Sequence, residues 1–349
     1  MANLLVTGGA GFIGGNFVHY WNAKHPDDGV VVLDALTYAG NRSTLEGTTA
    51  ELVVGDIRDT ALVESLLRAH DIDTIVHFAA ESHVDRSITG PDAFIDTNIL
   101  GTNSLLKAAR AVWLAGDGRA HRFHHISTDE VFGSLGPNDP AFSEVTPYAP
   151  NSPYSASKAA SDHLVRAYHH TYGLEVTTSN CSNNYGPYQY PEKLIPLFLL
   201  NALHGRPLPI YGDGMNVRDW LHVEDHCRGI EACLLRGIPG ETYNIGGGAE
   251  LPNLEVIAAI CREVDRALAE VDGLSARYPQ APAARGEPTE TLKTFVTDRA
   301  GHDRRYAIDE AKARAELNYA PKHGFDEGLR QTLRWYLDNE NWWRPLLAD

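Results

Sequence analysis

Two pairs of side chains in this sequence have the types and spacing needed for proton transfer. Asp129 and Glu130 directly follow a short apolar run, and Tyr154 stands four residues before Lys158. If Pro153 begins a helix, the tyrosine and the lysine share one face of it. A phenol has a pKa of about 10, and a neighbouring ammonium favours the phenolate, which makes the phenol usable as a base. This part of the chain therefore predicts an acid–base centre.

The two adjacent carboxyl groups suit a reaction that needs both an acid and a base. Mutual repulsion and burial raise the pKa of one carboxyl group, so that one holds a proton while the other accepts one. Two plainer interpretations stay open. Asp129 and Glu130 could be helix N-terminal or exposed loop acids, and Tyr154 and Lys158 could be a chance pair on a helix surface.

Length and composition limit the class of protein. The 349 residues are 43% hydrophobic and 22% charged, as in an ordinary globular protein of one large or two moderate domains. A net charge of -16 argues against nucleic acid as a partner. No apolar run is long enough for a membrane span and no signal peptide is apparent, so we expect a cytoplasmic protein.

The cysteines and histidines give no metal-ligand pattern. The four cysteines contain no CxxC pair, and we expect them to be reduced packing residues. The 16 histidines include no HExxH spacing, so we predict no metal site.

A glycine-rich turn near the start points to a nucleotide. Gly8, Gly11 and Gly14 lie between an expected strand at 3–7 and a helical pattern, where glycines let a pyrophosphate approach a helix N-terminus. Such a motif can also be only a turn. A second expected strand ends at Asp34, about 20 residues after the turn, where an acid binds the adenosine ribose and disfavours a 2′-phosphate. The combination favours NAD over NADP.

Strands and helices alternate along the first part of the chain. We expect strands at 30–33, 52–54, 72–78, 176–180 and 242–245, and helices at about 92–113, 154–172, 254–268 and 325–339. This order predicts an α/β fold with a doubly wound parallel sheet of Rossmann type, plus a smaller, discontinuous mixed α/β domain. We assign 1–185 plus about 221–248 to the first domain, and about 186–220 plus 249–349 to the second.

Three further segments carry specific expectations. Residues 182–187 should break regular structure and leave side-chain amides free to bind, and 272–290 should be an exposed loop. The cation-rich segment 298–306 suits a diphosphate, although it could be a solvated charge run. Arg218 could bind a ligand or pair only with Asp213 or Asp219. The final Trp342 and Trp343 should pack.

The chain resembles the extended short-chain dehydrogenase/reductase family and, within it, the dTDP-glucose 4,6-dehydratases. GxxGxxG and YxxxK indicate only the superfamily. The narrower resemblance rests on five further stretches: 80–87, 127–131, 183–188, 192–196 and 301–306. Related epimerases and decarboxylases usually lack the Asp-Glu pair after the threonine, and that pair favours the dehydratases.

The motifs and the resemblance together assign three sets of residues. The catalytic set is Thr128, Asp129, Glu130, Tyr154 and Lys158. The NAD-binding set is Gly8, Gly11, Phe12, Ile13, Gly14, Asp34, Thr37, Asp56, Ile57, Ala79, Ala80, Ser82, Thr97, Tyr154, Lys158 and Asn184. The set that binds the sugar nucleotide is Ser82, Thr128, Asn183, Lys193, Leu194, Pro209, Tyr211, Arg218, Asn253, Arg299 and His302.

The resemblance implies a redox-neutral elimination on dTDP-glucose. Tyr154 would take the C4 hydroxyl proton while NAD takes the C4 hydride, Glu130 would take the C5 proton, and Asp129 would protonate the departing C6 hydroxyl. The hydride would then return to C6. A homodimer formed through helices near residues 100 and 165 is implied in the same way. A nucleotide-sugar 4-epimerase or decarboxylase is the enzymatic alternative, and a non-catalytic NAD-sensing protein is the alternative from another class.

Overall fold

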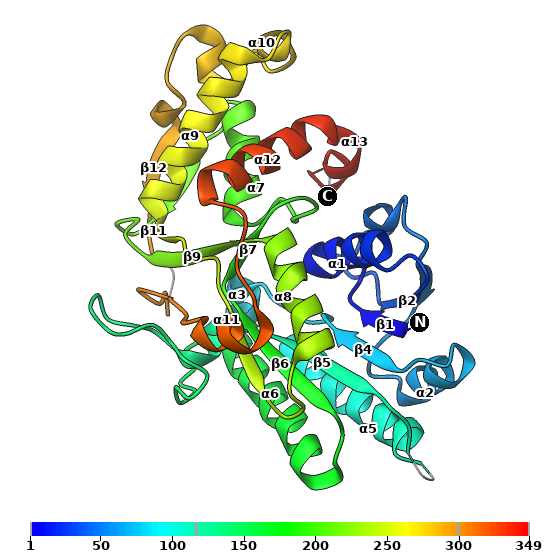
Figure 1. Cartoon of the computed structure of the whole chain (residues 1–349). Helices are drawn as coiled ribbons and strands as arrows, with labels where there is room; N and C mark the ends of the chain where they lie inside the picture. Colours follow the sequence, from blue (N-terminus) through cyan, green and yellow to red (C-terminus); the bar gives the residue numbers. More distant parts are fainter. Residues whose placement is uncertain (1, 116–117, 299–300, 348–349) are drawn as a thin grey trace.

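A seven-stranded parallel sheet is the main element of the computed structural model, which describes residues 2–115, 118–298 and 301–347 (Figure 1). The strand order is β10-β6-β5-β4-β1-β2-β3, and every neighbouring pair is parallel. The strands are β1 (Asn3–Thr7), β2 (Gly29–Asp34), β3 (Glu51–Val54), β4 (Thr74–His77), β5 (Arg122–Thr128), β6 (Val176–Cys181) and β10 (Thr242–Ile245). The predicted doubly wound sheet is confirmed.

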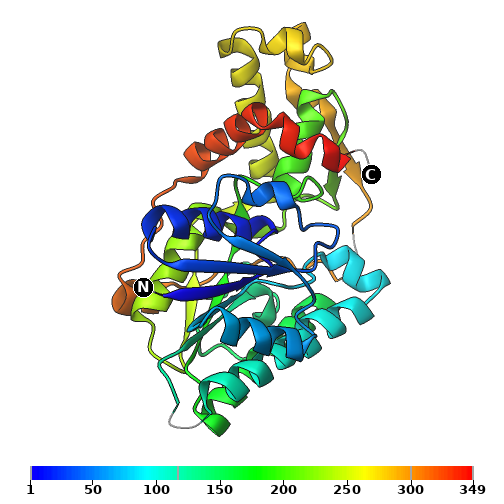
Figure 2. The ribbon, with the colours of Figure 1, turned by 90° about the vertical axis from the view of Figure 1, so that its right-hand side faces the viewer.

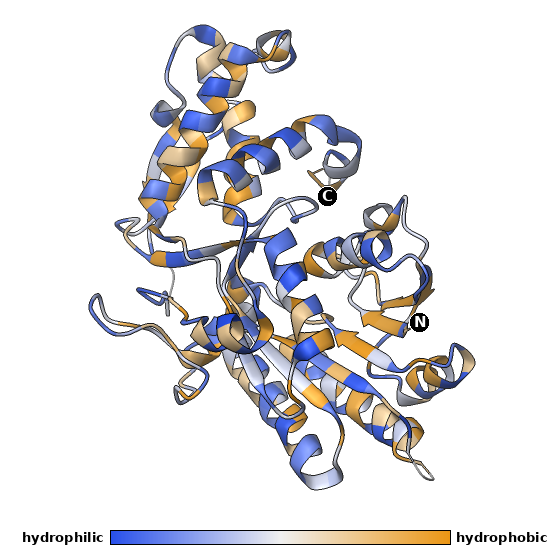
Figure 3. Ribbon diagram, in the orientation of Figure 1, coloured by the Kyte–Doolittle hydropathy of each residue, from blue (hydrophilic) through white to orange (hydrophobic). Residues whose placement is uncertain are grey.

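Helices cover both faces of this sheet because its strands alternate apolar side chains between the two faces (Figures 1 and 2). Leu4 and Val6 of β1 pack with α1 (Phe12–Lys24) and α8 (Val223–Arg236). Leu5 packs on the other face, which α2, α5 and α6 cover. Those helices span Thr60–Ala69, Thr102–Trp113 and Pro153–Tyr172. Figure 3 shows the apolar β1 and β4 as orange arrows inside these layers.

A smaller lobe lies beyond the sheet, at the top of Figures 1 and 2. Its hydrophobic core joins α7 (Leu194–Leu203), α9 (Asn253–Glu270) and α12 (Phe325–Asp338). Two short sheets belong to it: β11-β9-β7 and β12-β8. Their strands are β7 (Asn183–Tyr185), β8 (Leu208–Tyr211), β9 (Val217–His222), β11 (Glu250–Pro252) and β12 (Lys293–Val296).

The remaining helices are short. They are α3 (Val84–Thr89), α4 (Asp92–Phe94), α10 (Leu274–Arg277), α11 (Ala311–Leu317) and α13 (Glu340–Trp343). Helix α11 packs against α8 and β10, so the chain touches the main sheet again after leaving the lobe. The two-domain division stays a prediction.

Three local expectations were wrong or incomplete. Residues 182–187 were expected to lack regular structure, but they contain the strand β7. This strand pairs with β9, which lies more than 30 residues further along the chain. The segment 272–290 is not an exposed loop, because it folds into α10 and two 3₁₀ turns that bury Leu274 and Tyr278. The helix expected at 92–113 is interrupted by a π-helical segment, Ile95–Gly101.

Other expectations hold. Trp342 and Trp343 are buried in the lobe core, as predicted. All four cysteines are free and buried. Among the described residues, no helix has the length and apolar character needed to cross a membrane.

Candidate active site

A cavity of about 600 Å³ lies at the carboxyl ends of the parallel strands, and we call it the sheet cavity. Ligands of open α/β sheets bind at this edge. All the residues predicted to contact NAD line it: Gly8, Gly11, Phe12, Ile13, Gly14, Asp34, Thr37, Asp56, Ile57, Ala79, Ala80, Ser82, Thr97, Tyr154, Lys158 and Asn184. The structure therefore brings this set together, while the individual contacts stay predictions.

The glycine turn has the geometry of a phosphate cradle. Gly8 has a φ of 70°, and a Cβ there would lie 2.6 Å from the nitrogen of Ala79, so the residue must be glycine. A Cβ on Gly14 would lie 2.4 Å from the carbonyl oxygen of Gly8. A Cβ on Gly11 would meet only that same oxygen, at 3.3 Å, and Gly11 lines the sheet cavity. The turn thus leaves room for a pyrophosphate at the start of α1.

Asp34 ends β2 at the far side of this turn. Its carboxylate accepts hydrogen bonds from the backbone N–H groups of Ala10 at 2.9 Å and Leu36 at 2.8 Å. Burial raises the pKa of Asp34, and these two bonds oppose the shift. The carboxylate is therefore fixed beside the glycine turn, and its remaining lone pairs can accept ribose hydroxyls.

The acid pair lies where β5 ends in the sheet cavity. A 3₁₀ turn, Asp129–Phe132, follows the strand, and the Thr128 hydroxyl caps it by accepting from the Glu130 N–H at 3.3 Å. Asp129 is only 1% exposed and its Oδ2 is buried without a partner. Burial, helped by Glu130, raises the pKa of Asp129 well above its ordinary value. Asp129 is thus a buried carboxyl group whose surroundings favour the protonated form, not an exposed loop residue.

The tyrosine and the lysine lie on the buried face of α6. Pro153 and a Ser152 capping box begin the helix, as the sequence predicts for its start. Tyr154 and Lys158 are both buried, which excludes a chance surface pair. The Thr128 hydroxyl lines the same cavity and acts to lower the pKa of the Tyr154 phenol.

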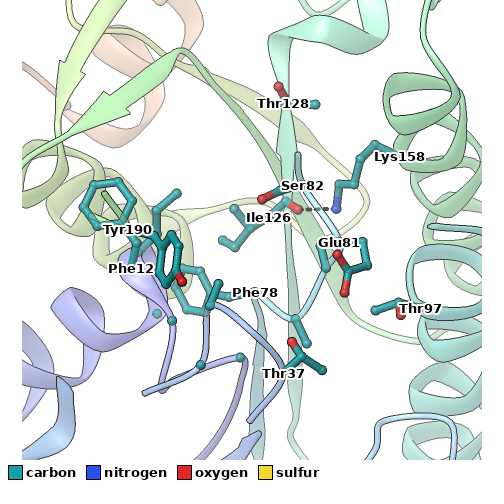
Figure 4. A pocket seen from close by; sticks show the side chains of 18 of the residues that line it. Phe12, Thr37, Phe78, Glu81, Ser82, Thr97, Ile126, Thr128, Lys158 and Tyr190 are labelled. Carbon is teal, nitrogen blue, oxygen red and sulfur yellow. Dashed lines mark hydrogen bonds between the residues drawn. The ribbon is translucent and has the colours of Figure 1, made fainter. Parts of the chain in front are cut away.

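One electrostatic expectation differs from the structure. Burial and the Glu130 carboxylate raise the pKa of Tyr154 well above its ordinary value. The Lys158 ammonium instead donates to the carbonyl of Ile126 at 2.7 Å, as Figure 4 shows. The protein alone therefore keeps Tyr154 protonated, and its use as a base depends on positive charge that arrives with a ligand.

A second cavity of about 260 Å³, which we call the lobe cavity, adjoins the first. The residues that line both are Ser82, Glu130, Asn183, Asn184, Gln189, Glu192 and Lys193. The predicted substrate residues that line the lobe cavity are Ser82, Asn183, Lys193, Leu194, Pro209, Tyr211, Arg218, Asn253 and His302. Thr128 lines the sheet cavity, and Arg299 lies outside the described residues.

In the cation-rich segment 298–306, His302 lines the lobe cavity, whereas Arg304 and Arg305 form ion pairs with Asp213 and Glu250. Arg218 is buried, and its guanidinium donates to the carbonyls of Val217 at 2.7 Å and Asp303 at 3.0 Å. Asp213 pairs with Arg304 instead. Because Arg218 is buried and bonded to these two carbonyl groups, its cation is fixed at the wall of the lobe cavity, where it can bind an anion.

Tyr38 and Tyr190 line the sheet cavity but were not predicted to do so. Tyr38 and Tyr190 form an edge-to-face pair with ring centroids 5.6 Å apart, and Arg86 stacks on Tyr38 at 3.7 Å. No local motif marks the two tyrosines, whereas Arg86 lies in the stretch 80–87 that carries the narrower resemblance. Asp162 was also missed, although its position four residues after Lys158 on a helix could have revealed it.

One group of potential metal ligands exists among the described residues. The ligand atoms of His222, Glu224 and His323 lie within 4.8 Å of one another, but these residues line neither cavity. The His323 Nδ1–H already donates to the Asp225 carboxylate at 3.0 Å. The group is thus separate from the site described above.

The fold and the sheet cavity define an NAD-binding enzyme of the extended short-chain dehydrogenase/reductase class. The GDP-mannose 4,6 dehydratase family model matches residues 5–332. The chain is 56% identical to a dTDP-glucose 4,6-dehydratase of Xanthomonas campestris over 99% of this chain and 96% of that protein. It belongs to the dTDP-glucose 4,6-dehydratase family.

Two solved structures support this placement. DesIV, the dTDP-glucose 4,6-dehydratase of Streptomyces venezuelae, was solved with NAD bound; it is 48% identical, has a TM-score of 0.87, and 99% of each chain is covered. A UDP-glucose 4-epimerase of Thermotoga maritima has a TM-score of 0.82 at 27% identity, with 97% and 99% covered. The fold alone is therefore shared with epimerases, whereas the sequence identity favours the dehydratases.

Proposed function

We propose that this chain converts dTDP-glucose to dTDP-4-keto-6-deoxyglucose and water. The observation that carries the proposal is the burial of Asp129 beside Glu130, in the same cavity as Tyr154 and Lys158, because this burial favours the protonated form of Asp129. An elimination needs an acid for the leaving hydroxyl and a base for the C5 proton. A 4-epimerase or a decarboxylase needs neither of these two groups.

Each catalytic side chain has one task. Tyr154 takes the proton of the C4 hydroxyl, and Thr128, which lines the same cavity, holds the C4 oxygen in place. The C4 ketone acidifies the C5 proton, which Glu130 removes. Asp129 gives its proton to the departing C6 hydroxyl, so that water leaves. C5 then recovers the proton that Glu130 holds, and the C4 oxygen stays a ketone. The proton that Tyr154 took from the C4 hydroxyl leaves through solvent, and Asp129 regains one proton from solvent, so both side chains return to their starting states.

NAD is the cofactor that the sheet cavity fits. Gly8, Gly11 and Gly14 would hold the pyrophosphate, and Asp34 would hold the adenosine ribose. When bound, NAD supplies the hydride acceptor at C4, the hydride donor at C6 and a positive charge that lowers the pKa of Tyr154. Lys158, whose ammonium lines the same cavity, adds to that positive field.

The nucleotide would occupy the lobe cavity. Lys193 and Arg218 line it, and cations of this kind suit a diphosphate. In this arrangement the residues shared by the two cavities would hold the hexose between the nucleotide and the nicotinamide. Arg299 and His302 stay predicted contacts of the same ligand.

The test is turnover of the purified protein. With dTDP-glucose we expect a 4-keto product that absorbs near-ultraviolet light in alkali, and a panel of uridine, cytidine and guanosine diphosphate sugars defines the base preference. No product from any nucleotide-glucose would defeat the proposal. The epimerase and decarboxylase alternative predicts that Glu130→Gln leaves turnover intact.

We further propose a homodimer, the two-domain division predicted from the sequence, and a cytoplasmic location. Ile88, Ile95 and Leu100 are large apolar residues exposed near residue 100, which supports a partner on that surface. A monomeric mass in solution would refute the dimer.

A further inference from the structure

A buried pair of opposite charges lies behind Tyr154, and the proposed steps use only half of it. Lys158 is 4% exposed and Asp162 is 6% exposed. Tyr154, Lys158 and Asp162 follow one another at intervals of four residues on α6, so they share the face that packs against the sheet. The lysine lines the sheet cavity and the aspartate lies one turn further along the helix.

Three donors from two other segments hold the Asp162 carboxylate. The Ser127 hydroxyl donates to Oδ2 at 2.7 Å and the Tyr148 hydroxyl donates to the same oxygen at 3.0 Å. His125 Nε2 lies 3.0 Å from Oδ1. Burial raises the pKa of Asp162 to about 6, while Lys158 and these hydroxyl groups oppose the rise. At neutral pH the group is therefore an anion inside the protein.

His125 separates this anion from the ammonium. Its Nε2 lies 3.5 Å from Lys158 Nζ, and its Nδ1 is buried without a partner. Burial and Lys158 lower the pKa of His125 well below its ordinary value, so the ring is neutral. An Nε2–H that donates to Asp162 leaves Nδ1 as an unpaired acceptor, which costs less than an unpaired buried donor.

Apart from Asp162, the groups around the Lys158 ammonium do little to balance its positive charge. Nζ donates to the carbonyl of Ile126, which is neutral. The titratable groups around it are Asp162 on α6, His125 on β5, Cys181 on β6 and His77 on β4. Burial lowers the pKa of Lys158, and Asp162 is the leading influence that raises it. Burial also keeps Cys181 protonated, because it raises the pKa of that thiol.

We propose that Asp162 is a positioning residue, which keeps Lys158 charged and fixed at the wall of the sheet cavity by supplying its buried counter-charge. The kinetic part rests on the proposed function. The rival interpretation is that Asp162 only joins Ser127 and Tyr148 and has no effect on the lysine.

A double-mutant cycle tests the electrostatic link without using activity. Lys158→Met and Asp162→Asn each remove one charge at similar size, and melting temperatures of the two single variants and the double variant are measured in the full-length protein. We expect the double variant to lose several degrees less than the two single losses added together, because each single change leaves a buried charge alone. This coupling should fade as the pH falls below about 6, where Asp162 becomes protonated. Additive losses at every pH would overturn the proposal.

The pH profile of dTDP-glucose turnover tests the consequence. In Asp162→Asn we expect a lower kcat with little change in KM, and an alkaline limb moved to lower pH by roughly one unit, because Lys158 loses its proton more readily. An unmoved alkaline limb in a folded variant contradicts the proposal.

Tyr148→Phe keeps the test decisive if Asp162→Asn does not fold. It removes one donor, so the pKa of Asp162 rises and the acid limb of turnover should move to higher pH. Tyr168→Phe is the matched control, because the Tyr168 hydroxyl is on the same helix as Asp162 but donates to Asn103 instead. An acid limb that moves equally in both variants, or in neither, contradicts the proposal. If the wild-type protein shows no turnover but the double-mutant cycle shows coupling, the proposed function is refuted. The electrostatic link between Asp162 and Lys158 then still stands.

Discussion

The sheet cavity and the lobe cavity are built in different ways. The sheet cavity draws its groups from the ends of neighbouring parallel strands, where a backbone ladder fixes each position. The lobe cavity draws on separated segments of the chain, at about 82–85, 183–198, 209–220, 253–257 and 302, which only packing brings together. The rigid edge therefore suits the chemistry, and the assembled wall suits recognition. Substitutions in the first should lower kcat, and substitutions in the second should raise KM.

The largest effect is expected from Tyr154→Phe in the sheet cavity. The change removes the proposed base but keeps the ring against Phe94, so turnover should fall roughly 10³-fold while NAD binding is kept. Turnover and NAD affinity measured on the same preparation check this, with Tyr168→Phe as the control. Turnover within a factor of ten of the wild type would remove Tyr154 from its role and leave the sheet cavity as a binding site only.

Glu130→Gln should follow, with turnover lower by roughly 10²-fold to 10³-fold. Oxidation at C4 needs only Tyr154, so the reaction should stop at the ketone and the near-ultraviolet absorbance of reduced nicotinamide should rise to the enzyme concentration. Rapid-scan absorbance after mixing with dTDP-glucose detects it. Intact turnover without this signal would favour the epimerase and decarboxylase alternative.

Asp129→Asn separates activity from stability at the same site. A raised carboxyl pKa means that the folded state holds this proton more tightly than the unfolded chain. The stability contributed by this group is thus present at low pH and declines as pH rises from about 4 toward the folded pKa. Asparagine cannot ionise, so at pH 8 the variant should melt no lower than the wild type while turnover falls roughly 10²-fold. A large loss of melting temperature would mean that Asp129 is a structural group.

The sheet cavity was the more predictable of the two from sequence. The glycine turn, Asp34 and the YxxxK pair are each local, and the rule that parallel strands end at one edge brings them together. Continuous patterns could not reveal Tyr38 and Tyr190, which meet across 152 positions of the chain, or the β7–β9 pairing that orders 183–185. The wrong prediction of an exposed loop at 272–290 has the same cause. The alanines and prolines there show no helical or strand periodicity, and only the folded chain packs Tyr278 with residues of α7 and α9.

The expected influence of Lys158 on Tyr154 illustrates a second limit. The spacing correctly put both residues on one helical face, but spacing carries no information on burial. In the folded protein, burial and the Glu130 carboxylate raise the pKa of the phenol, and the ammonium donates to the carbonyl of Ile126. A sequence can thus identify which groups meet, whereas the direction of a pKa shift depends on how dry their surroundings are.

Asn253→Ala tests the lobe cavity. The Oδ1 atom of Asn253 is buried without a partner and the residue lines that cavity, so a ligand donor there would satisfy it. We expect KM for dTDP-glucose to rise roughly 5-fold to 20-fold with kcat nearly kept, which corresponds to about 1–2 kcal/mol. Asn201→Ala is the matched control, because that amide on α7 bonds the carbonyl of Pro207. A fall in kcat alone would contradict the division of labour between the two cavities.

The smallest effect concerns the connection between the two regions. The chain from α11, on the sheet, to α12, in the lobe, is fastened to α8 by Asp225, which accepts from the N–H groups of Lys322 at 2.9 Å and His323 at 2.8 Å. Its hydrogen bond to the His323 ring raises the pKa of His323 above 6.5. A raised histidine pKa stabilises the fold fully below the unfolded pKa, and this stabilisation is lost as pH rises through the folded one. His323→Gln should therefore cost on the order of 1 kcal/mol more at pH 5.5 than at pH 9, seen as a difference of a few degrees in melting temperature. An equal cost at both pH values would mean that the Asp225 contact with the ring contributes through packing alone, and that the join between sheet and lobe does not respond to protons.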